Sequence, residues 1–350
     1  MNIRVLYCGV DTLEATFAGV LSEQLPVILD AAKTKAQATD TPVEFMIGED
    51  RFHVSGRGLG KYSWVVSDHR MQIRISRAMT GLPVVGVRLW ASALATYGHV
   101  ALYAEASRLI ALLGDMHPNT LSRIDLAVDV QGFDFTDADF ERLVCAATYR
   151  VIHKDGAGVT YSVGKADVVV RVYRKDVELK VKDKLSYAKV WERVADYDSE
   201  AATWRLEVQL RGSVLKELNA RSVEVAFTKL GGLFQFGMHW CELRVPRADA
   251  TKKRWPVDVI WSLIAAVWGA SKPEPRIRKA AQLEREDHVI SRLCGAVATL
   301  GAYSGQSELI EVLVLAVPRM EACLKVKGIE FSDLVDTKFA RIDSGEEVPF

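Results

Sequence analysis

The sequence predicts an α+β fold, in which a curved, mainly antiparallel sheet is followed by a helical C-terminal region. Alternating apolar and polar residues mark several short strands, because side chains in a strand repeat every two residues. Residues 62–94 and 161–215 share a pattern, a Tyr-Ser hairpin followed by V-x-L-x-x-S-x-L. Beyond Asn219 the apolar spacing becomes helical. We therefore expect two similar β-β-β-α halves, paired as a saddle-like sheet, and then helices.

Composition bounds the kinds of protein this chain can be. It has 350 residues, of which 49% are hydrophobic and 26% charged, and this supports a real core. The net charge is zero, so a nucleic-acid surface would have to come from local segregation of charge. Five cysteines stand singly, which indicates a reducing compartment, and no signal peptide or membrane span is visible. We expect a soluble, cytoplasmic protein.

The first half of the predicted sheet covers about residues 40–115. Before it, a strand, a turn and a second strand are expected over 3–17, and a helix over 21–38. The half itself should contain two hairpins, a strand and a long helix, at 43–54, 62–77, 84–90 and 92–113. Gly114 after that helix is a usual C-terminal stop.

The second half covers about residues 120–220. A strand at 122–130 precedes a helix at 137–149, for which Thr136 is the expected cap. A strand pattern then runs from Tyr161 to Lys175, a charged helical insert follows at 176–195, and the last strand is 204–211. We place a first domain at 1–270 and a helical region at 271–350, whose end from Asp343 to Phe350 looks disordered.

Three carboxylates stand on the polar faces of predicted strands. Asp125 and Asp129 share one face of their strand, and Glu207 lies on the polar face of another. Mg²⁺ and Mn²⁺ take carboxylate oxygens and leave positions for phosphate and water, so these acids are candidate metal ligands. The other interpretation is that they are solvent-facing acids paired with Arg123, Arg171 and Arg205.

Tyr173 is the candidate nucleophile, with Arg171 and Lys175 on its own face of the strand. A tyrosine hydroxyl has a pKa near 10, and a nearby cation or metal favours the phenolate. Ordinary packing of a strand tyrosine is the alternative. Other chemistries lack their motifs: the sequence has no His-x-His pair, no H-E-x-x-H, no G-x-S-x-G, and its glycine-rich loop at 55–62 does not fit a P-loop.

Four motifs in order resemble the Rep_trans family of replication initiation factors of rolling-circle plasmids, phages and related mobile elements. They are Arg123-Ile-Asp-Leu-Ala-Val-Asp129, Tyr161-Ser-Val-Gly-Lys165, Val170-Arg-Val-Tyr-Arg-Lys-Asp-Val-Glu178 and Trp204-Arg-Leu-Glu-Val-Gln-Leu-Arg211. The resemblance covers roughly residues 5–260. It implies an enzyme that nicks and closes DNA through a 5′-phosphotyrosine, needs a divalent metal, and leaves a 3′ hydroxyl for a polymerase.

The resemblance also assigns roles to residues of this chain. Tyr173 would be the nucleophile, with Lys175 beside it and Tyr161 as the second candidate. Asp125 and Glu207 would bind Mg²⁺ or Mn²⁺, with Asp129 and Glu178 in reserve. Phosphates would be held by the basic residues of the strands, Arg171, Lys175, Arg205 and Arg211. Arg174 departs from the family, which often has Asp or Asn after the tyrosine.

Three functions remain open at this point. The first is a sequence-specific initiator of rolling-circle replication, acting on a single-stranded or hairpin nick site. A conjugative relaxase with the same chemistry and a non-catalytic, origin-recognising DNA-binding protein are the alternatives. Specificity would reside in the helical tail or in the basic loop at 244–254, with Arg244, Lys252, Lys253 and Arg254. Besides DNA, a host helicase and a second copy of the chain are candidate partners, and a membrane is not.

Overall fold

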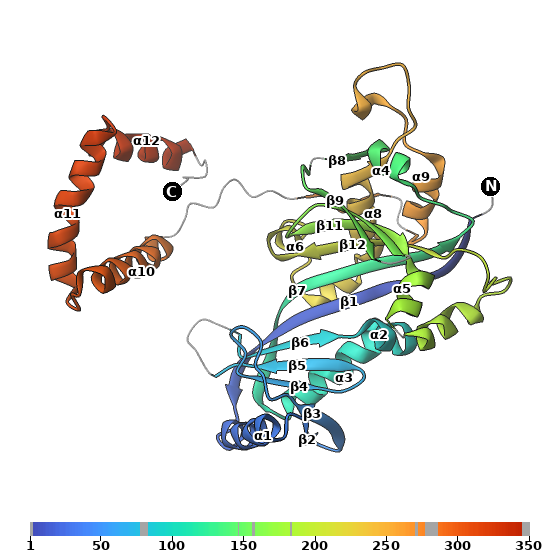
Figure 1. Cartoon of the computed structure of the whole chain (residues 1–350), viewed down its shortest axis with the longest axis horizontal. Coiled ribbons are helices and arrows are strands. Elements are labelled where there is room, and N and C mark those ends of the chain that lie inside the picture. Colours follow the sequence, from blue (N-terminus) through green and yellow to red (C-terminus); the bar gives the residue numbers. More distant parts are fainter. Residues whose placement is uncertain are drawn as a thin grey trace. The chain divides into compact units, whose positions relative to one another are not determined.

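The computed structural model describes residues 3–77, 83–145, 147–155, 158–182, 184–269, 272–276 and 286–344. The chain divides into two compact units, Met1–Arg276 and Ile277–Phe350. The first unit is a mixed unit of sheet and helices, and the second contains helices only among its described residues (Figure 1). An α+β fold with C-terminal helices is therefore confirmed.

An open, antiparallel sheet forms the first unit, and eleven described strands belong to it (Figure 1). Their order is β2-β3-β4-β5-β6-β1-β7-β12-β11-β10-β9. The bounds are β1 Arg4–Leu21, β2 Val43–Ile47, β3 Asp50–Val54, β4 Trp64–Ser67, β5 Met71–Ile75, β6 Val85–Leu89, β7 Gly114–Gln131, β9 Arg150–Asp155, β10 Gly158–Val163, β11 Val168–Arg174 and β12 Trp204–Arg211. The predicted strands and hairpins of both halves are thus present.

Helices cover the apolar face of this sheet. Buried side chains of α1, α3, α6 and α8 pack with it in one core. The helices of the first unit are α1 Leu25–Thr39, α2 Ala91–Tyr97, α3 His99–Ala111, α4 Asp137–Arg142, α5 Lys175–Val181, α6 Gly212–Glu217, α7 Val223–Phe227, α8 Leu230–Trp240 and α9 Val259–Ala266, with 3₁₀ helices η1 Leu185–Arg193 and η2 Lys252–Arg254. The opposite face carries the polar side chains of the predicted site.

Long-range pairing changed several predicted elements. The predicted turn within residues 3–17 is wrong, because β1 is one strand that pairs with β7 from Arg4–Gln131 to Leu21–Gly114. The predicted helix at 92–113 is two helices, separated at Gly98, whose φ of 80° is not helical. The predicted helix at 137–149 ends at Arg142, because β8 (Leu143–Cys145) pairs with β13 (Cys241–Leu243). Thr136 caps α4 as expected, in a capping box with Asp139.

The second unit contains three described helices, α10 Glu286–Ser304, α11 Leu309–Val326 and α12 Phe331–Ser344. Asp343 and Ser344, predicted to begin a disordered end, belong to α12. The rest of that predicted end, residues 345–350, lies outside the described residues. Within the described part of the chain, no helix combines the length and apolar character needed to cross a membrane.

Candidate functional site

Three neighbouring strands carry the predicted site. In the ladder between β11 and β12, Arg171 stands opposite Glu207 and Tyr173 opposite Arg205. In the next ladder, Asp125 of β7 stands opposite Gln209 of β12. Residues directly opposite each other project from the same face of a sheet. The structure therefore brings Asp125, Glu207 and Tyr173 to one face, where all three line one cleft of about 720 Å³.

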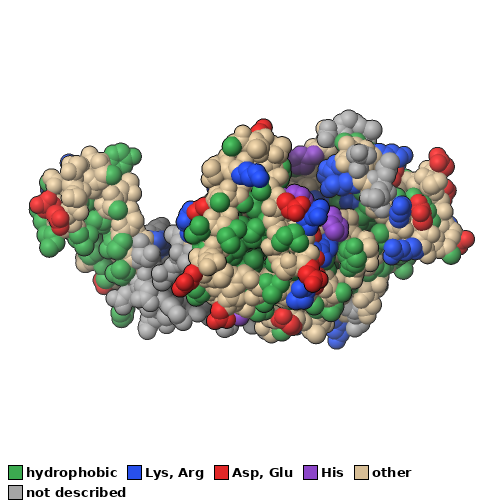
Figure 2. Space-filling model, turned by 90° about the horizontal axis from the view of Figure 1, so that it is seen from below, with side chains coloured by type: hydrophobic (Ala, Val, Ile, Leu, Met, Phe, Trp, Pro, Cys, Tyr) green, Lys and Arg blue, Asp and Glu red, His purple; other side chains and the backbone are tan. Residues whose placement is uncertain are grey.

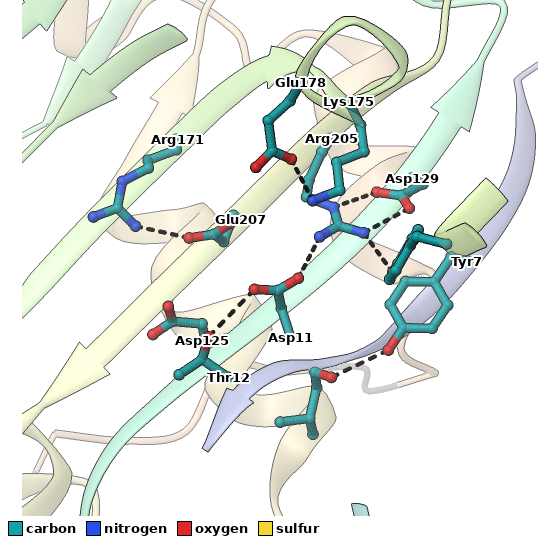
Figure 3. A network of polar contacts seen from close by, with 12 residues as sticks. Tyr7, Asp11, Thr12, Asp125, Asp129, Arg171, Lys175, Glu178, Arg205 and Glu207 are labelled. Carbon is teal, nitrogen blue, oxygen red and sulfur yellow. Dashed lines mark hydrogen bonds and ion pairs between the residues drawn. The ribbon is translucent and has the colours of Figure 1, made fainter. Parts of the chain in front are cut away.

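Tyr173 is held by Glu207 within this cleft. The Tyr173 hydroxyl donates a hydrogen bond of 3.0 Å to Oε2 of Glu207, and Arg171 donates one of 2.7 Å to Oε1 (Figure 3 shows the second). Burial and the charge of Glu207 raise the pKa of Tyr173 well above its usual 10, and the opposing effect of Arg205 is smaller. The expected phenolate is therefore not the resting form, and Tyr173 needs a base to release its proton.

Asp125 is the more deeply placed carboxylate of the cleft, with 1% of its surface exposed. Arg123 donates to it twice, through Nε at 2.7 Å and through Nη2. Burial, followed by the charge of Glu207, raises the pKa of Asp125 to about 7, against the lowering effect of Arg123. The negative charges of Asp125 and Glu207 repel each other, and a bound cation would relieve this repulsion.

Lys175 begins α5 directly after β11 and reaches back over the site. Its Nζ lies 5.6 Å from the ring centre of Tyr173 and 5.2 Å from that of Tyr187. Nζ also donates a hydrogen bond of 2.5 Å to Glu178, one turn along the helix. Lys175 thus lies beside the Tyr173 ring. Its charge is already paired with Glu178, as Figure 3 shows.

Arg205 and Asp129 do not lie in the cleft. Arg205 is fully buried, and its guanidinium donates to Asp129 at 2.5 and 2.7 Å, to Tyr187 at 2.6 Å and to Asp11 (Figure 3). Asp129 is also fully buried and accepts a further bond of 2.9 Å from Trp191. Because Arg205 has no exposed surface for a phosphate and Asp129 none for a metal, both predicted roles are corrected: these residues form a structural network, which we call the closed network.

The remaining basic residues are divided between two places. Arg211 ends β12 opposite Arg123, next to the cleft. None of Arg244, Lys252, Lys253 and Arg254 lines the cleft. Arg244 donates to the carbonyls of Lys253 and Trp255 and pairs with Glu242, so it closes its own loop. Lys252 donates to the carbonyl of Glu141, and Lys252, Lys253 and Arg254 are all exposed.

Tyr161, the second candidate nucleophile, points to the other side of the sheet. In the ladder between β10 and β11, Thr160 stands opposite Tyr173, and Tyr161 stands opposite Val172. Tyr161 belongs to the hydrophobic core, and its hydroxyl donates to Asp137 at 2.8 Å. It therefore shares neither a face nor a carboxylate with Glu207.

A divalent cation fits the donor chemistry of the cleft through a pair of acids. Asp125 and Glu207 offer hard oxygen donors beside space for phosphate oxygens, which suits Mg²⁺ or Mn²⁺. No group of three acidic, histidine or cysteine side chains in the described chain has metal-binding spacing. The expected third ligand Asp129 is absent from the pair because Arg205 holds it.

Sequence reasoning missed several residues of this face. Asp11, Thr12 and Arg88 line the cleft, and Glu14 lies between arginines of neighbouring strands. Asp11 and Glu14 come from β1, which pairs with β7 across more than a hundred residues of sequence. The alternation of β1 was visible, but its partner strand was not.

Comparison with solved structures finds a likeness in fold. Neither the family models nor the curated proteins contain a match to this sequence. Among solved structures, the chain is similar to the rolling circle replication initiator protein from Geobacillus stearothermophilus, with a TM-score of 0.48 and 16% sequence identity. The match covers 79% of this chain and 100% of that chain.

Proposed function

We propose that this chain is a DNA nicking-closing enzyme that initiates rolling-circle replication through Tyr173. The observation that carries the proposal is the Tyr173–Glu207 hydrogen bond of 3.0 Å at a cleft that also holds Asp125 and Arg171. Tyr173 as nucleophile, Glu207 as base and Arg171 as phosphate-binding group are thus within reach of one phosphodiester. The resemblance in the sequence supplies the reaction class.

Each group has a defined part in the strand-transfer step. The Tyr173 oxygen attacks the phosphorus and forms the phosphotyrosine bond, while its proton passes to Oε2 of Glu207. The bond from phosphorus to the 3′ oxygen breaks, and this oxygen takes up a proton from solvent water as it leaves as a 3′ hydroxyl. Arg171 forms an ion pair with Glu207 and could also donate a hydrogen bond to a phosphate oxygen. Closing is the reverse step.

Asp125 and Glu207 are the residues that would hold Mg²⁺ or Mn²⁺. Such a cation, when bound, would offset the charge that develops on the phosphate. Its binding would also favour the ionised form of Asp125, whose pKa is raised to about 7 by burial and by Glu207. Metal binding should therefore release a proton near neutral pH.

Covalent attachment to DNA is the direct test. Wild-type protein with Mn²⁺ and a labelled single-stranded origin oligonucleotide should give an adduct that survives denaturing electrophoresis, and Tyr173→Phe should give none. Tyr161→Phe is the matched control, because it removes a buried tyrosine hydroxyl bonded to a carboxylate on the opposite face. An adduct formed by Tyr173→Phe would refute the assignment. Chelation of the metal should also stop the reaction.

A non-catalytic DNA-binding protein is the second candidate. It is favoured by one observation, the raised pKa of Tyr173, which keeps this hydroxyl protonated. Salt-dependent DNA binding without any adduct, in the presence of Mn²⁺, would select it. A conjugative relaxase would use the same groups and give the same adduct; nicking assays on replication origins and transfer origins distinguish the two.

We also propose that the sheet is a saddle of two similar halves. The strand order supports this, because β6 lies beside β1 and β12 beside β7, with β1 and β7 paired at the centre. Each shared V-x-L-x-x-S-x-L pattern falls where β6 leads into α2 and β12 into α6. A cytoplasmic protein that meets DNA, a host helicase and a second copy of itself fits this function; sedimentation with and without DNA would test the dimer.

A further inference from the structure

A row of arginines crosses the polar face of the sheet beside the cleft. In the ladders from β5 to β12, five residues stand opposite one another in turn: Gln72, Arg88, Glu14, Arg123 and Arg211. Arg74 joins the row, since it donates 2.8 Å to Gln72 and 3.2 Å to Glu14. We call Arg74, Arg88, Arg123 and Arg211 the arginine row.

The arginine row is short of negative partners. Glu14 lies 3.2, 3.8 and 3.7 Å from Arg74, Arg88 and Arg123, so one carboxylate serves three guanidinium groups. Asp125 serves Arg123 in addition. The buried Nε atoms of Arg88 and Arg211 have no hydrogen-bond partner among the described residues. Burial, followed by the charge of Arg123, lowers the pKa of Arg211, and Glu14 and Asp125 oppose this.

An anion with several charges in sequence would relieve this crowding. Neighbouring strands lie about 4.8 Å apart, so a row over five strands is roughly 19 Å long. That length suits a few consecutive phosphates of an extended strand rather than one isolated anion. Arg88 and Arg123 also line the cleft that contains Tyr173, so a chain of phosphates on the row would continue into the proposed reaction site.

The surroundings favour a single strand. Trp90 follows Arg88 and lines the same cleft, with the Arg88 guanidinium 5.4 Å from its ring centre. Aromatic rings beside backbone-binding cations are typical of single-strand grooves, because exposed bases stack on them. His69 lines this cleft and also a second hollow of about 1070 Å³, and Figure 2 shows a face on which histidine, acidic and basic side chains lie close together.

We propose that the arginine row binds the phosphate backbone of single-stranded DNA and leads it across β5, β6, β1 and β7 to Tyr173. This rests on the proposed function for the identity of the strand. The binding itself needs no cleavage, so it can be measured separately. It also shifts the main DNA contact from the loop at 244–254 to the sheet.

The test is binding of a fluorescein-labelled single-stranded oligodeoxynucleotide to the full chain in EDTA, followed by anisotropy over a series of salt concentrations. Arg88→Gln and Arg74→Gln should each weaken binding about fivefold and reduce the slope of log K against log salt by about 0.7, the value for one phosphate contact on a single strand. Arg77→Gln is the matched control: it follows β5 but pairs with Asp30 of α1. It should bind as wild type.

The outcomes separate the two proposals. Unchanged affinity and slope in both variants, with melting temperatures near wild type, would overturn the arginine row, even if Tyr173 forms its adduct. If both variants lose binding and the wild-type protein forms no adduct in Mn²⁺, the arginine row is supported and the nicking function is overturned. A duplex of the same sequence that competes as well as the single strand would overturn the single-strand assignment.

Discussion

Two neighbouring residues of β12 have opposite environments. Arg205 and Glu207 project from the same face of one strand, yet Arg205 is sealed in the closed network and Glu207 lines the cleft. The difference comes from the insert between β11 and β12. Tyr187 and Trp191 of η1 pack with Leu6 and Leu179 and hydrogen-bond to Arg205 and Asp129, whereas Glu207 and Asp125 line the cleft together with other residues of the insert. What covers a polar face therefore decides whether its charges serve structure or chemistry.

The closed network and the cleft also differ in how well their charged groups are paired. Asp129 accepts three hydrogen bonds and Arg205 reaches three different partners. The pKa of Asp125, by contrast, is raised by burial and then by the charge of Glu207, although Arg123 opposes the shift. Removing one partner of a buried, fully hydrogen-bonded ion pair lowers the free energy of unfolding strongly. Removing an acid whose ionised form is disfavoured should lower it little.

Asp129→Asn and Asp125→Asn form the matched pair with the largest expected difference. Asp129→Asn leaves the fully buried Arg205 short of its main countercharge and should lower the free energy of unfolding by about 3–5 kcal/mol. Asp125→Asn should change it by about 1 kcal/mol or less at pH 8, since the ionised carboxyl is disfavoured there. Urea unfolding measures both. Equal losses would mean that both ends are structural.

Sequence reasoning predicted which residues lie on the polar face of the sheet, but not which of them the insert covers. Alternation placed Asp125, Glu207 and Tyr173 on the polar faces of their strands. Alternation gives the same reading for Arg205 as for Glu207, because it reports which face a residue has and nothing of what packs on it. The insert was predicted only as a charged helix, so the contacts of Tyr187 and Trp191 with the closed network were not expected.

Crossover topology was the second limit. β1 pairs with both β6 and β7, and it brings Asp11 to Arg205 and Glu14 to the arginine row. Strand pairing over such separations is set by the packing of the whole sheet, which no local pattern encodes. Cys145 and Cys241 show the same effect: they stood apart in the sequence and face each other across β8 and β13.

The pH dependence of stability sharpens the comparison at Asp125. Its pKa is about 7 in the folded protein and near 3.8 when unfolded, so the folded chain keeps the proton between these values. The stability contributed by that proton is full below pH 4 and is lost as pH rises through 7, by on the order of 2–4 kcal/mol. The unfolding free energy of wild type minus that of Asp125→Asn should therefore fall over this window.

Mn²⁺ provides the companion measurement. At pH 7.5 it should raise the melting temperature of wild type, since the proposed cation site of Asp125 and Glu207 would be assembled only in the folded state. Asp125→Asn should respond less. An equal rise in both proteins would place the cation elsewhere.

Glu178 lies where the insert meets the cleft and should give an intermediate effect. Lys175 and Lys182 lower its pKa to about 2, although burial opposes them. An acid with a lowered pKa contributes stability above its unfolded value near 4.5, and this is lost as pH falls through 2. Glu178→Gln should cost roughly 2 kcal/mol at pH 7 and progressively less in acid. Urea unfolding from pH 2 to pH 7 measures it.

Lys182→Ala is the control for that variant. It removes an exposed partner of Glu178, so its cost should stay within about 0.5 kcal/mol. If Lys182→Ala lowers the free energy of unfolding more than Glu178→Gln does, the exposed pair with Lys182, and not the contact with the buried Lys175, accounts for the stability that Glu178 contributes.

Tyr187→Phe tests how the insert closes this network, and its expected effect is small. It removes the hydroxyl that accepts 2.6 Å from Arg205 and keeps the ring that packs on Trp191 and Tyr7. Since Asp129 still holds the same guanidinium nitrogen, the cost should be about 1 kcal/mol. Tyr197→Phe, which also retains a ring against Trp191, should cost less. If Tyr187→Phe instead loses as much as Asp129→Asn, the insert closes the network mainly through this hydroxyl and not through its apolar cover.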